Sequence, residues 1–224
     1  MAAVLHWVRR EVQAVQERAA AAMTLVTEQG FAVLLAQGTI LRGWALAEQG
    51  QREEGIAQIG QGLAAHRLTG TEAHRPSYLA LLAEAHGKVG QVEEGLKMLA
   101  EALAAVDKTG ECYYEAELYR LKGELTLQFN VQGSKFKVEK SPKSEVRSPE
   151  SEAEECFLKA IDIARRQSAK SWELRAVMSL SRLWQQQGKK KKARQMLTEI
   201  YGWFTEGFDT RDLQEARALL QELI

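Results

Sequence analysis

Apolar residues recur along this chain at intervals of three and four, the spacing that places them on one face of an α-helix. The clearest cases are four pairs of large apolar side chains whose members are four positions apart: Ile59 and Leu63, Leu99 and Leu103, Phe157 and Ile161, Leu197 and Tyr201. The first member of each pair lies four positions after a small residue. Polar and charged residues fill the positions between them. The pattern predicts amphipathic helices separated by turns.

The same pattern returns with a 40-residue period. Gly50-Gln51 corresponds to Gly90-Gln91, and Glu53-Glu54-Gly55 corresponds to Glu93-Glu94-Gly95. Two further copies keep this register, because Ala153 and Ala193 are separated by the same interval. The interval from Gly95 to Ala153 is longer than one period, which indicates an 18-residue insertion in the third copy. The alternative is an ordinary helical bundle with chance similarity, which would not keep the register across four copies.

Each copy predicts a helix, a turn at a glycine and a second helix. The small residue early in the second helix lets the two helices approach closely. We expect a partial repeat or N-terminal capping helices at residues 1–30, then repeat 1 at residues 31–70 and repeat 2 at residues 71–110. Repeat 3 is expected at residues 111–170, with a disordered insertion at about 130–149, and repeat 4 at residues 171–208. Residues 209–224 are expected to form a C-terminal capping helix in which Asp209 or Thr210 can be the N-cap.

The repeat resembles the tetratricopeptide repeat (TPR). The family's motif has a small residue in the first helix, and the matching residues here are Gly43, Ala83, Gly123 and Ser181. The larger residue three positions on is matched by Leu46, His86, Thr126 and Trp184. The small residue early in the second helix is matched by Gly55, Gly95, Ala153 and Ala193. The resemblance implies an all-α fold, a right-handed superhelical α-solenoid of TPR-like helix hairpins. The 40-residue period is longer than the family's usual period of about 34 residues, so each pair carries extra helical turns.

Long-period repeats of this kind resemble the C-terminal regions of bacterial cyclase and signal-transducing ATPase proteins, including sensors of the maltose-regulator type. The segments that carry this resemblance are residues 43–50 and 200–210. It implies a non-catalytic scaffold or sensor module of a bacterial signalling protein.

Residues 11–29 occupy the place of a second helix whose own first helix is mostly missing. Two explanations stay open: the chain is a piece of a longer protein, or these residues are a natural N-terminal cap. An incomplete first repeat would leave Val4, Leu5, Trp7 and Val8 uncovered, and such a patch favours a homodimer.

Charge and composition exclude several classes of function. Lys+Arg and Asp+Glu both number 30, so the formal net charge is zero and no nucleic-acid partner is expected. The sequence has no apolar stretch long enough to cross a membrane, so no membrane span is expected. Cys112 and Cys156 are far apart, as in a protein with free thiols in a reducing compartment, and we expect the cytoplasm.

Catalytic motifs are missing from the sequence. The four histidines have no His or Cys partner at metal-binding spacing, and no phosphate-binding loop or nucleophile motif occurs. We therefore expect no enzyme activity, no cofactor and no metal. Two weaker possibilities are a phosphate contact at the basic run Lys189–Lys192 and phosphorylation at Ser141-Pro142 or Ser148-Pro149; solvated turns explain both segments as well.

The remaining candidate site is a surface. In tetratricopeptide arrays the first helices line a concave groove, and the matching positions here are Gln37, Ile40, Trp44, Glu48, Glu84, Lys88, Glu117, Arg120, Glu124, Arg175 and Arg182. We expect this mixed-charge groove to bind a peptide or a protein domain. Trp44 is either an exposed anchor or a packed residue. The alternative functions are a small-molecule-sensing regulatory domain and a self-association module.

Overall fold

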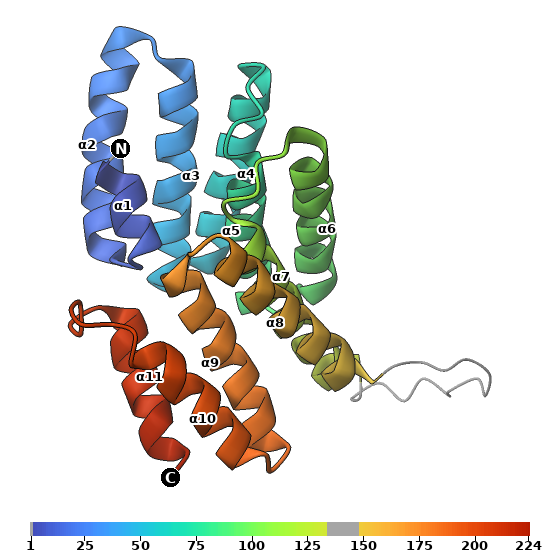
Figure 1. The fold of residues 1–224 in the computed structure, drawn as a ribbon. Coiled ribbons are helices and arrows are strands. Elements are labelled where there is room, and N and C mark those ends of the chain that lie inside the picture. The colour runs from blue at the N-terminus through green and yellow to red at the C-terminus, as the bar shows by residue number, and fades with distance from the viewer. Residues whose placement is uncertain (1, 134–147) are drawn as a thin grey trace, which may run out of the picture. The chain divides into compact units, whose positions relative to one another are not determined.

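The chain folds into helices joined by short turns (Figure 1), in a computed structural model that describes residues 2–133 and 148–224. These residues contain eleven α-helices: α1 Ala2–Val8, α2 Val12–Gln29, α3 Ala32–Glu48, α4 Arg52–Leu68, α5 Arg75–Lys88, α6 Val92–Thr109, α7 Glu115–Gly133, α8 Pro149–Arg166, α9 Lys170–Gln186, α10 Lys190–Tyr201 and α11 Arg211–Glu222. The all-α prediction is confirmed. Over the described ranges no helix is long and apolar enough to cross a membrane.

The chain divides into two compact units, residues 1–112 and residues 113–224. In the first unit α3 pairs with α4 and α5 with α6, while α2 packs on α3 and α1 packs on α2. In the second unit α7 pairs with α8 and α9 with α10, and α11 packs on both α9 and α10. Each unit is therefore built from helix hairpins that follow one another in sequence order.

Left-handed residues end most of the helices at a regular 20-residue spacing. In the first unit the residues at positions 10, 30, 50, 70, 90 and 110 all have φ between 61° and 95°, and all except Arg10 are glycines. Glycine is favoured there because a Cβ strains this conformation. One helix with its turn therefore spans 20 residues, and a hairpin of two helices spans 40 residues, which is the period of the sequence repeat. In the second unit Ser168 after α8 and Gly188 after α9 repeat this spacing.

Helices α3 and α4 are packed closely through glycines. A Cβ on Gly43 would lie 2.8 Å from the backbone nitrogen of Ile59, and a Cβ on Gly62 would lie 2.6 Å from Cγ1 of Ile40. These contacts explain the small residues of the repeat, because any larger side chain would separate the helices. The acidic pairs Glu53-Glu54 and Glu93-Glu94 lie in the first turns of α4 and α6, where they favour the helix dipole.

The second unit has a continuous hydrophobic core. Phe157 of α8, Met178 and Trp184 of α9 and Leu197 of α10 are almost fully buried in it. Helix α11 adds three buried side chains to the same core, Leu213, Ala216 and Leu219, which follow one another at intervals of three along one face of the helix. The helix therefore packs on the last hairpin and extends its core.

Two predicted boundaries need correction. Helix α7 continues to Gly133 and α8 already includes Pro149, so the two ends of the predicted insertion, residues 130–133 and 149, are helical. Ser148 is the N-cap residue of α8, and the rest of that prediction, residues 134–147, falls outside the described residues. At α11 the N-cap residue is Thr210, but its hydroxyl donates to the Gly207 carbonyl oxygen at 2.6 Å instead of accepting from the helix.

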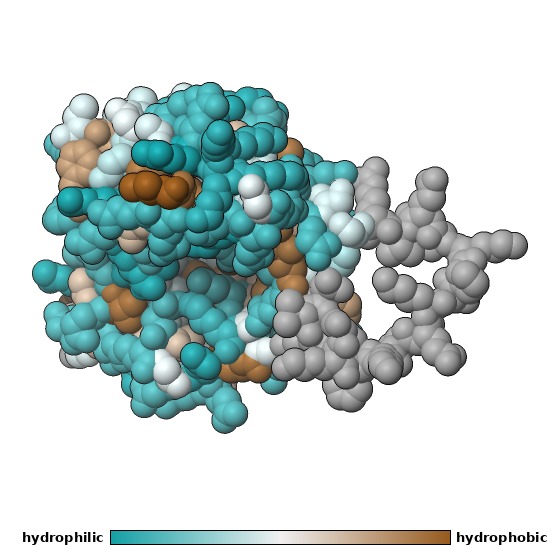
Figure 2. Space-filling model, turned by 90° about the horizontal axis from the view of Figure 1, so that it is seen from below, coloured by the Kyte–Doolittle hydropathy of each residue, from teal (hydrophilic) through white to brown (hydrophobic). Residues whose placement is uncertain are grey.

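The N-terminal helix is better covered than the sequence suggested. Trp7 is 5% exposed and Val8 is half-buried, whereas Val4 and Leu5 are exposed at 38% and 60%. The prediction of a four-residue apolar patch was therefore wrong for Trp7, which packs inward from α1. The face of the molecule seen in Figure 2 is mostly hydrophilic with separate apolar residues, and scattered apolar residues of this kind are common on protein surfaces.

Candidate functional site

The first unit brings three of the predicted groove residues into one cluster. The Lys88 ammonium of α5 pairs with Glu84 at 3.1 Å, one turn away on the same helix, and with Glu48 at the end of α3. All three side chains are partly buried, with 12% to 31% exposed. Burial lowers the pKa of Lys88, but the two carboxylates outweigh it, so its pKa lies above the ordinary value.

Two other predicted groove residues belong to the core. Ile40 is completely buried and Trp44 is 4% exposed, so the structure favours the packed interpretation of Trp44 over the exposed anchor. Both face neighbouring helices because α3 is covered on several sides, by α2, α4 and α5. Gln37 is half-buried on the same helix. In the first unit, the predicted groove residues that a binding partner could reach are therefore Gln37 and the cluster of Glu48, Lys88 and Glu84.

The second unit brings together predicted residues from α7 and α9. Arg120 donates to both oxygens of Glu117, at 2.8 Å from Nε and 2.7 Å from Nη2, and pairs with Glu124 at 2.5 Å. Ser179 of α9 donates to Glu124 at 2.8 Å. Spacings of three and four positions place Glu117, Arg120 and Glu124 along one stripe of α7, which faces α9 through Ser179.

Arg175 connects this stripe to α11. Its guanidinium lies 2.8 Å from the Asp212 carboxylate and 3.9 Å from Glu117, and it stacks on the Trp172 ring with 4.7 Å to the centroid. Arg175 and Glu117 are buried, 7% and 4% exposed. Arginine suits such a position because its planar fork can pair and stack at the same time. Sequence reasoning missed Asp212, because only the fold brings α11 beside α9.

Arg182 is the accessible end of this face. Its side chain is 47% exposed and lies 4.0 Å from Glu215 of α11, which makes this a long and therefore weak ion pair. Together with Arg175 and Ser179 it forms a stripe on α9 at spacings of three and four positions. A carboxylate of a binding partner could approach Arg182 without breaking a short internal pair.

A buried carboxylate outside the predicted set is Glu173, which is 3% exposed. Burial raises its pKa, but hydrogen bonds from Arg165 and Lys170, both 2.7 Å long, outweigh this and lower the pKa below the ordinary value. The carboxylate is thus a charged anchor between the end of α8 and the start of α9. The sequence carried a weak signal, since Lys170 and Glu173 are three positions apart in a helical segment.

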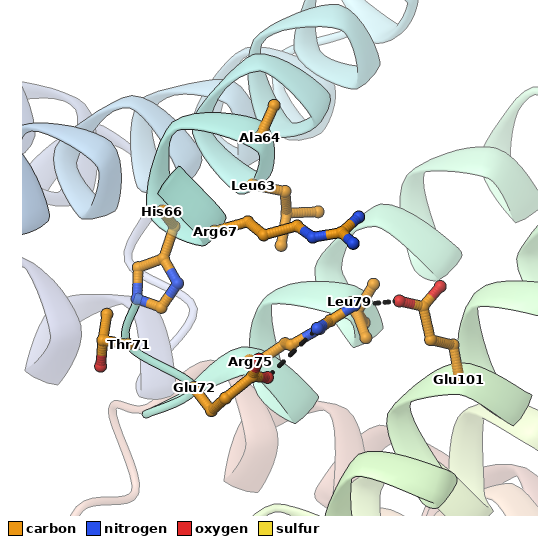
Figure 3. Close-up of a pocket in the computed structure, with 9 residues that line it drawn as sticks. All are labelled: Leu63, Ala64, His66, Arg67, Thr71, Glu72, Arg75, Leu79 and Glu101. Carbon is orange, nitrogen blue, oxygen red and sulfur yellow. Dashed lines mark hydrogen bonds and ion pairs between the residues drawn. The ribbon is translucent and has the colours of Figure 1, made fainter. Parts of the chain in front are cut away.

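A small hollow lies between the last turn of α4, the start of α5 and Glu101 of α6 (Figure 3). Arg75 crosses it and pairs with Glu72 at 3.1 Å and with Glu101. His66 lines one wall, 2% exposed, with its ring edge-to-face on Tyr78 at 5.4 Å. Burial first, and then the nearby His74, lower the pKa of His66, so it is neutral at pH 7.

The volume of this hollow, about 160 Å³, is below the several hundred Å³ of ordinary small-molecule sites. No group of three or more metal-binding side chains gathers in residues 2–133 and 148–224. Cys156 is half-buried, and burial raises the pKa of its thiol, which makes it a poor nucleophile. In the basic run Lys189–Lys192, two lysines contact the rest of the second unit. Lys192 lies over the Trp184 ring at 3.9 Å, and Lys189 is 3.8 Å from Glu154.

No family model matches the chain. An uncharacterized protein of Rhizobium meliloti (strain 1021) is 33% identical over 92 residues, which are 41% of this chain and 9% of that protein. The chain thus matches only a small part of that relative's length.

Solved structures similar to this chain are TPR-like. A putative kinesin light chain of Podosopora anserina with nearly identical TPR-like repeats has a TM-score of 0.52 at 18% identity, covering 98% of this chain and 92% of that one. BtubC (BKLC) from P. vanneervenii has a TM-score of 0.62 at 13% identity, covering 96% and 89%. A Rap protein complexed with competence and sporulation factor has a TM-score of 0.59 at 11% identity, covering 99% and 61%. These similarities confirm the TPR-like fold of helix hairpins.

Proposed function

We propose that this chain is a non-catalytic protein-binding module, part of a signalling protein, that holds a peptide or a folded domain against the face formed by its first helices. The observation that carries the proposal is the stripe of charged side chains from α7 and α9, in which Glu117, Arg120, Glu124 and Ser179 hold one another in place. A TPR-like fold suggests such a role, and a complexed Rap protein shares the fold.

The physical advantage of this face is that its charges are already ordered. A partner that binds there loses little additional side-chain entropy on the protein side. Charges of both signs in a fixed order favour a partner with the complementary order and disfavour others. Arg182 is the natural first contact because it is half-exposed and only weakly paired.

A photo-crosslinking amino acid at position 182, compared with one at position 166, tests this proposal. Arg166 is the matched control because it is also an exposed arginine, 67% exposed, but it lies on α8, a second helix. We expect a crosslinked partner from extracts of the source organism at position 182, lost in the Glu124→Lys background, and none at position 166. Equal crosslinking at both positions, or no effect of Glu124→Lys in a folded variant, would contradict the proposal.

The hollow between α4, α5 and α6 gives little support to a small-molecule-sensing role. The hollow of Figure 3 is small, and Arg75 with its two carboxylates fills its polar side.

A further inference from the structure

An exposed apolar patch lies at one end of the first unit. Phe31, just before α3, Leu34 of α3 and Leu68 at the end of α4 are 56%, 48% and 89% exposed. All three line one open hollow of about 780 Å³. We call these three residues, with the hollow between them, the Leu68 patch. Large apolar side chains exposed together, and not singly, mark a binding surface in most proteins.

The floor of this hollow is made of small residues. Ala36 of α3 and Gly62 and Ala65 of α4 line it between the large side chains. The floor cannot close by moving the helices together, because the two helices already touch: a Cβ on Gly62 would lie only 2.6 Å from Cγ1 of Ile40 and 3.0 Å from the Ala36 carbonyl oxygen. The hollow is therefore a lasting feature of the α3–α4 hairpin.

The chemistry of the lining is uniform. Among the described residues that line the hollow none is charged, and the polar ones are Thr39, Gln61 and Thr69. An apolar side chain can be buried there without removing a charge from water, which would be costly. A highly charged partner gains nothing at this surface.

We propose that the Leu68 patch binds a second copy of this chain, with Leu68 of each copy inserted over the Ala36–Gly62–Ala65 floor of the other. A two-fold dimer needs one surface that is complementary to itself. The patch meets this condition because it carries a projecting side chain, 89% exposed, directly beside a hollow lined by small residues. Electrostatic repulsion between copies is small, since the formal net charge is zero.

The size of the patch sets the strength of the dimer. Three large side chains expose several hundred Å², less than the roughly 800 Å² that each partner buries in a standard stable interface. The interface is therefore of the small, transient kind. This places self-association at the α3–α4 end of the unit and not at α1, where Trp7 is buried.

Sedimentation velocity over a concentration series, from low micromolar to near millimolar, tests the proposal on the full chain. We expect a monomer–dimer equilibrium for the wild type. Leu68→Glu, a change at a solvated position, raises the dissociation constant by about tenfold or more. Ala65→Leu keeps the surface apolar but fills the floor, and it weakens the dimer as well.

Two matched variants separate this surface from others. Leu5→Glu changes another exposed leucine, on α1, and Leu158→Glu changes an exposed leucine on α8. Neither alters the dimer if the Leu68 patch is the interface. A wild type that stays monomeric at the highest concentration overturns the proposal. So does a dimer that survives Leu68→Glu, a dimer that Leu5→Glu abolishes, or a dimer that Ala65→Leu strengthens, since the last result would show a non-specific apolar contact.

Discussion

Gly55 lies so close to Gly43 that a Cβ built on Gly55 would be 2.6 Å from the Gly43 carbonyl oxygen. It would also lie 2.7 Å from the backbone nitrogen of Ala47. The atoms that would clash are backbone atoms, which cannot rotate away as a flexible side chain can. The α3–α4 hairpin therefore depends on a glycine at each of these two positions.

We expect Gly55→Ala to lower the free energy of unfolding by about 1–3 kcal/mol, because the added methyl group must push α3 and α4 apart. The intrinsic preference of alanine for helices opposes this effect but is smaller, about 1 kcal/mol. Urea denaturation followed by circular dichroism measures the change.

Gly60→Ala is the matched control for this prediction. Gly60 is also in α4, but a Cβ there would meet no atom within 4 Å. We expect the variant to gain about 0.5–1 kcal/mol of stability from helix propensity alone. If both variants change stability in the same direction, the proposed close contact of α3 with α4 is wrong.

Removing the Arg175 charge should be costly. Arg175→Met removes the guanidinium that lies between Glu117 and Asp212, in a site where Arg175 and Glu117 are almost fully buried, while Glu117 keeps its ion pair with Arg120. We expect a loss of about 3–5 kcal/mol, the usual result of breaking a buried ion pair from one side. Thermal or chemical denaturation of the variant measures this loss.

The double variant Arg175→Met/Asp212→Asn should recover part of that loss, since it also removes the negative charge that Arg175 balances. Arg166→Ala is the surface control. Arg166 and Asp162 pair at 3.2 Å but are 67% and 68% exposed, so we expect a change of about 0.5 kcal/mol or less. A small effect of Arg175→Met would show that the network is open to solvent.

His66 should make stability depend on pH near neutrality. Its pKa in the folded chain is lowered from the ordinary value of 6.5, mainly by burial. Below pH 6.5 the unfolded chain therefore binds more protons than the folded chain, and stability falls as the pH falls. The contribution is fully present above pH 6.5 and is lost in more acidic solution.

We expect the wild type to lose up to about 1 kcal/mol per pH unit more than His66→Leu as the solution is acidified through this range. Leucine does not titrate and suits a site where the His66 Nε2 atom has no hydrogen-bond partner among the described residues. Parallel slopes for the two proteins in urea titrations would rule out this role of His66.

Ser148 caps α8. Its hydroxyl accepts a hydrogen bond from the Ser151 backbone N–H at 3.2 Å, and Pro149 starts the helix. We expect Ser148→Ala to cost about 1 kcal/mol and Ser148→Asp to retain most of the stability. Ser151→Ala is the control, because it keeps the N–H that Ser148 binds. Equal stability of Ser148→Ala and Ser151→Ala would mean that the cap contributes nothing.

Several features of the fold could be read from the sequence because they are local. Helical periodicity, the glycines after the helices and the small residues before Ile59 and Leu99 depend on contacts within one hairpin. The 20-residue spacing of Gly30, Gly50, Gly70, Gly90 and Gly110 is local in the same way, because each of these glycines follows the helix that it ends.

The candidate site was predictable only in part. Helical spacing placed Glu117, Arg120 and Glu124 on one stripe of a helix, and the structure has them there. The spacing could not show that Ile40 and Trp44 are covered, because a residue's burial depends on which other helices pack around its own. Asp212, Glu173 and the Leu68 patch were missed for the same reason.

The sequence by itself determined where most of the helices begin and end, which of them pair, and how closely they approach, because these properties follow from backbone preferences and from residue size within one repeat. Only the tertiary structure decided which charges meet, such as Arg175 with Asp212 across 37 positions, and which apolar side chains stay uncovered, such as Leu68. The charge pairs and the uncovered side chains both depend on contacts between different helices. A periodic pattern indicates which face of a helix makes such contacts, but not which residues of the other helices it meets.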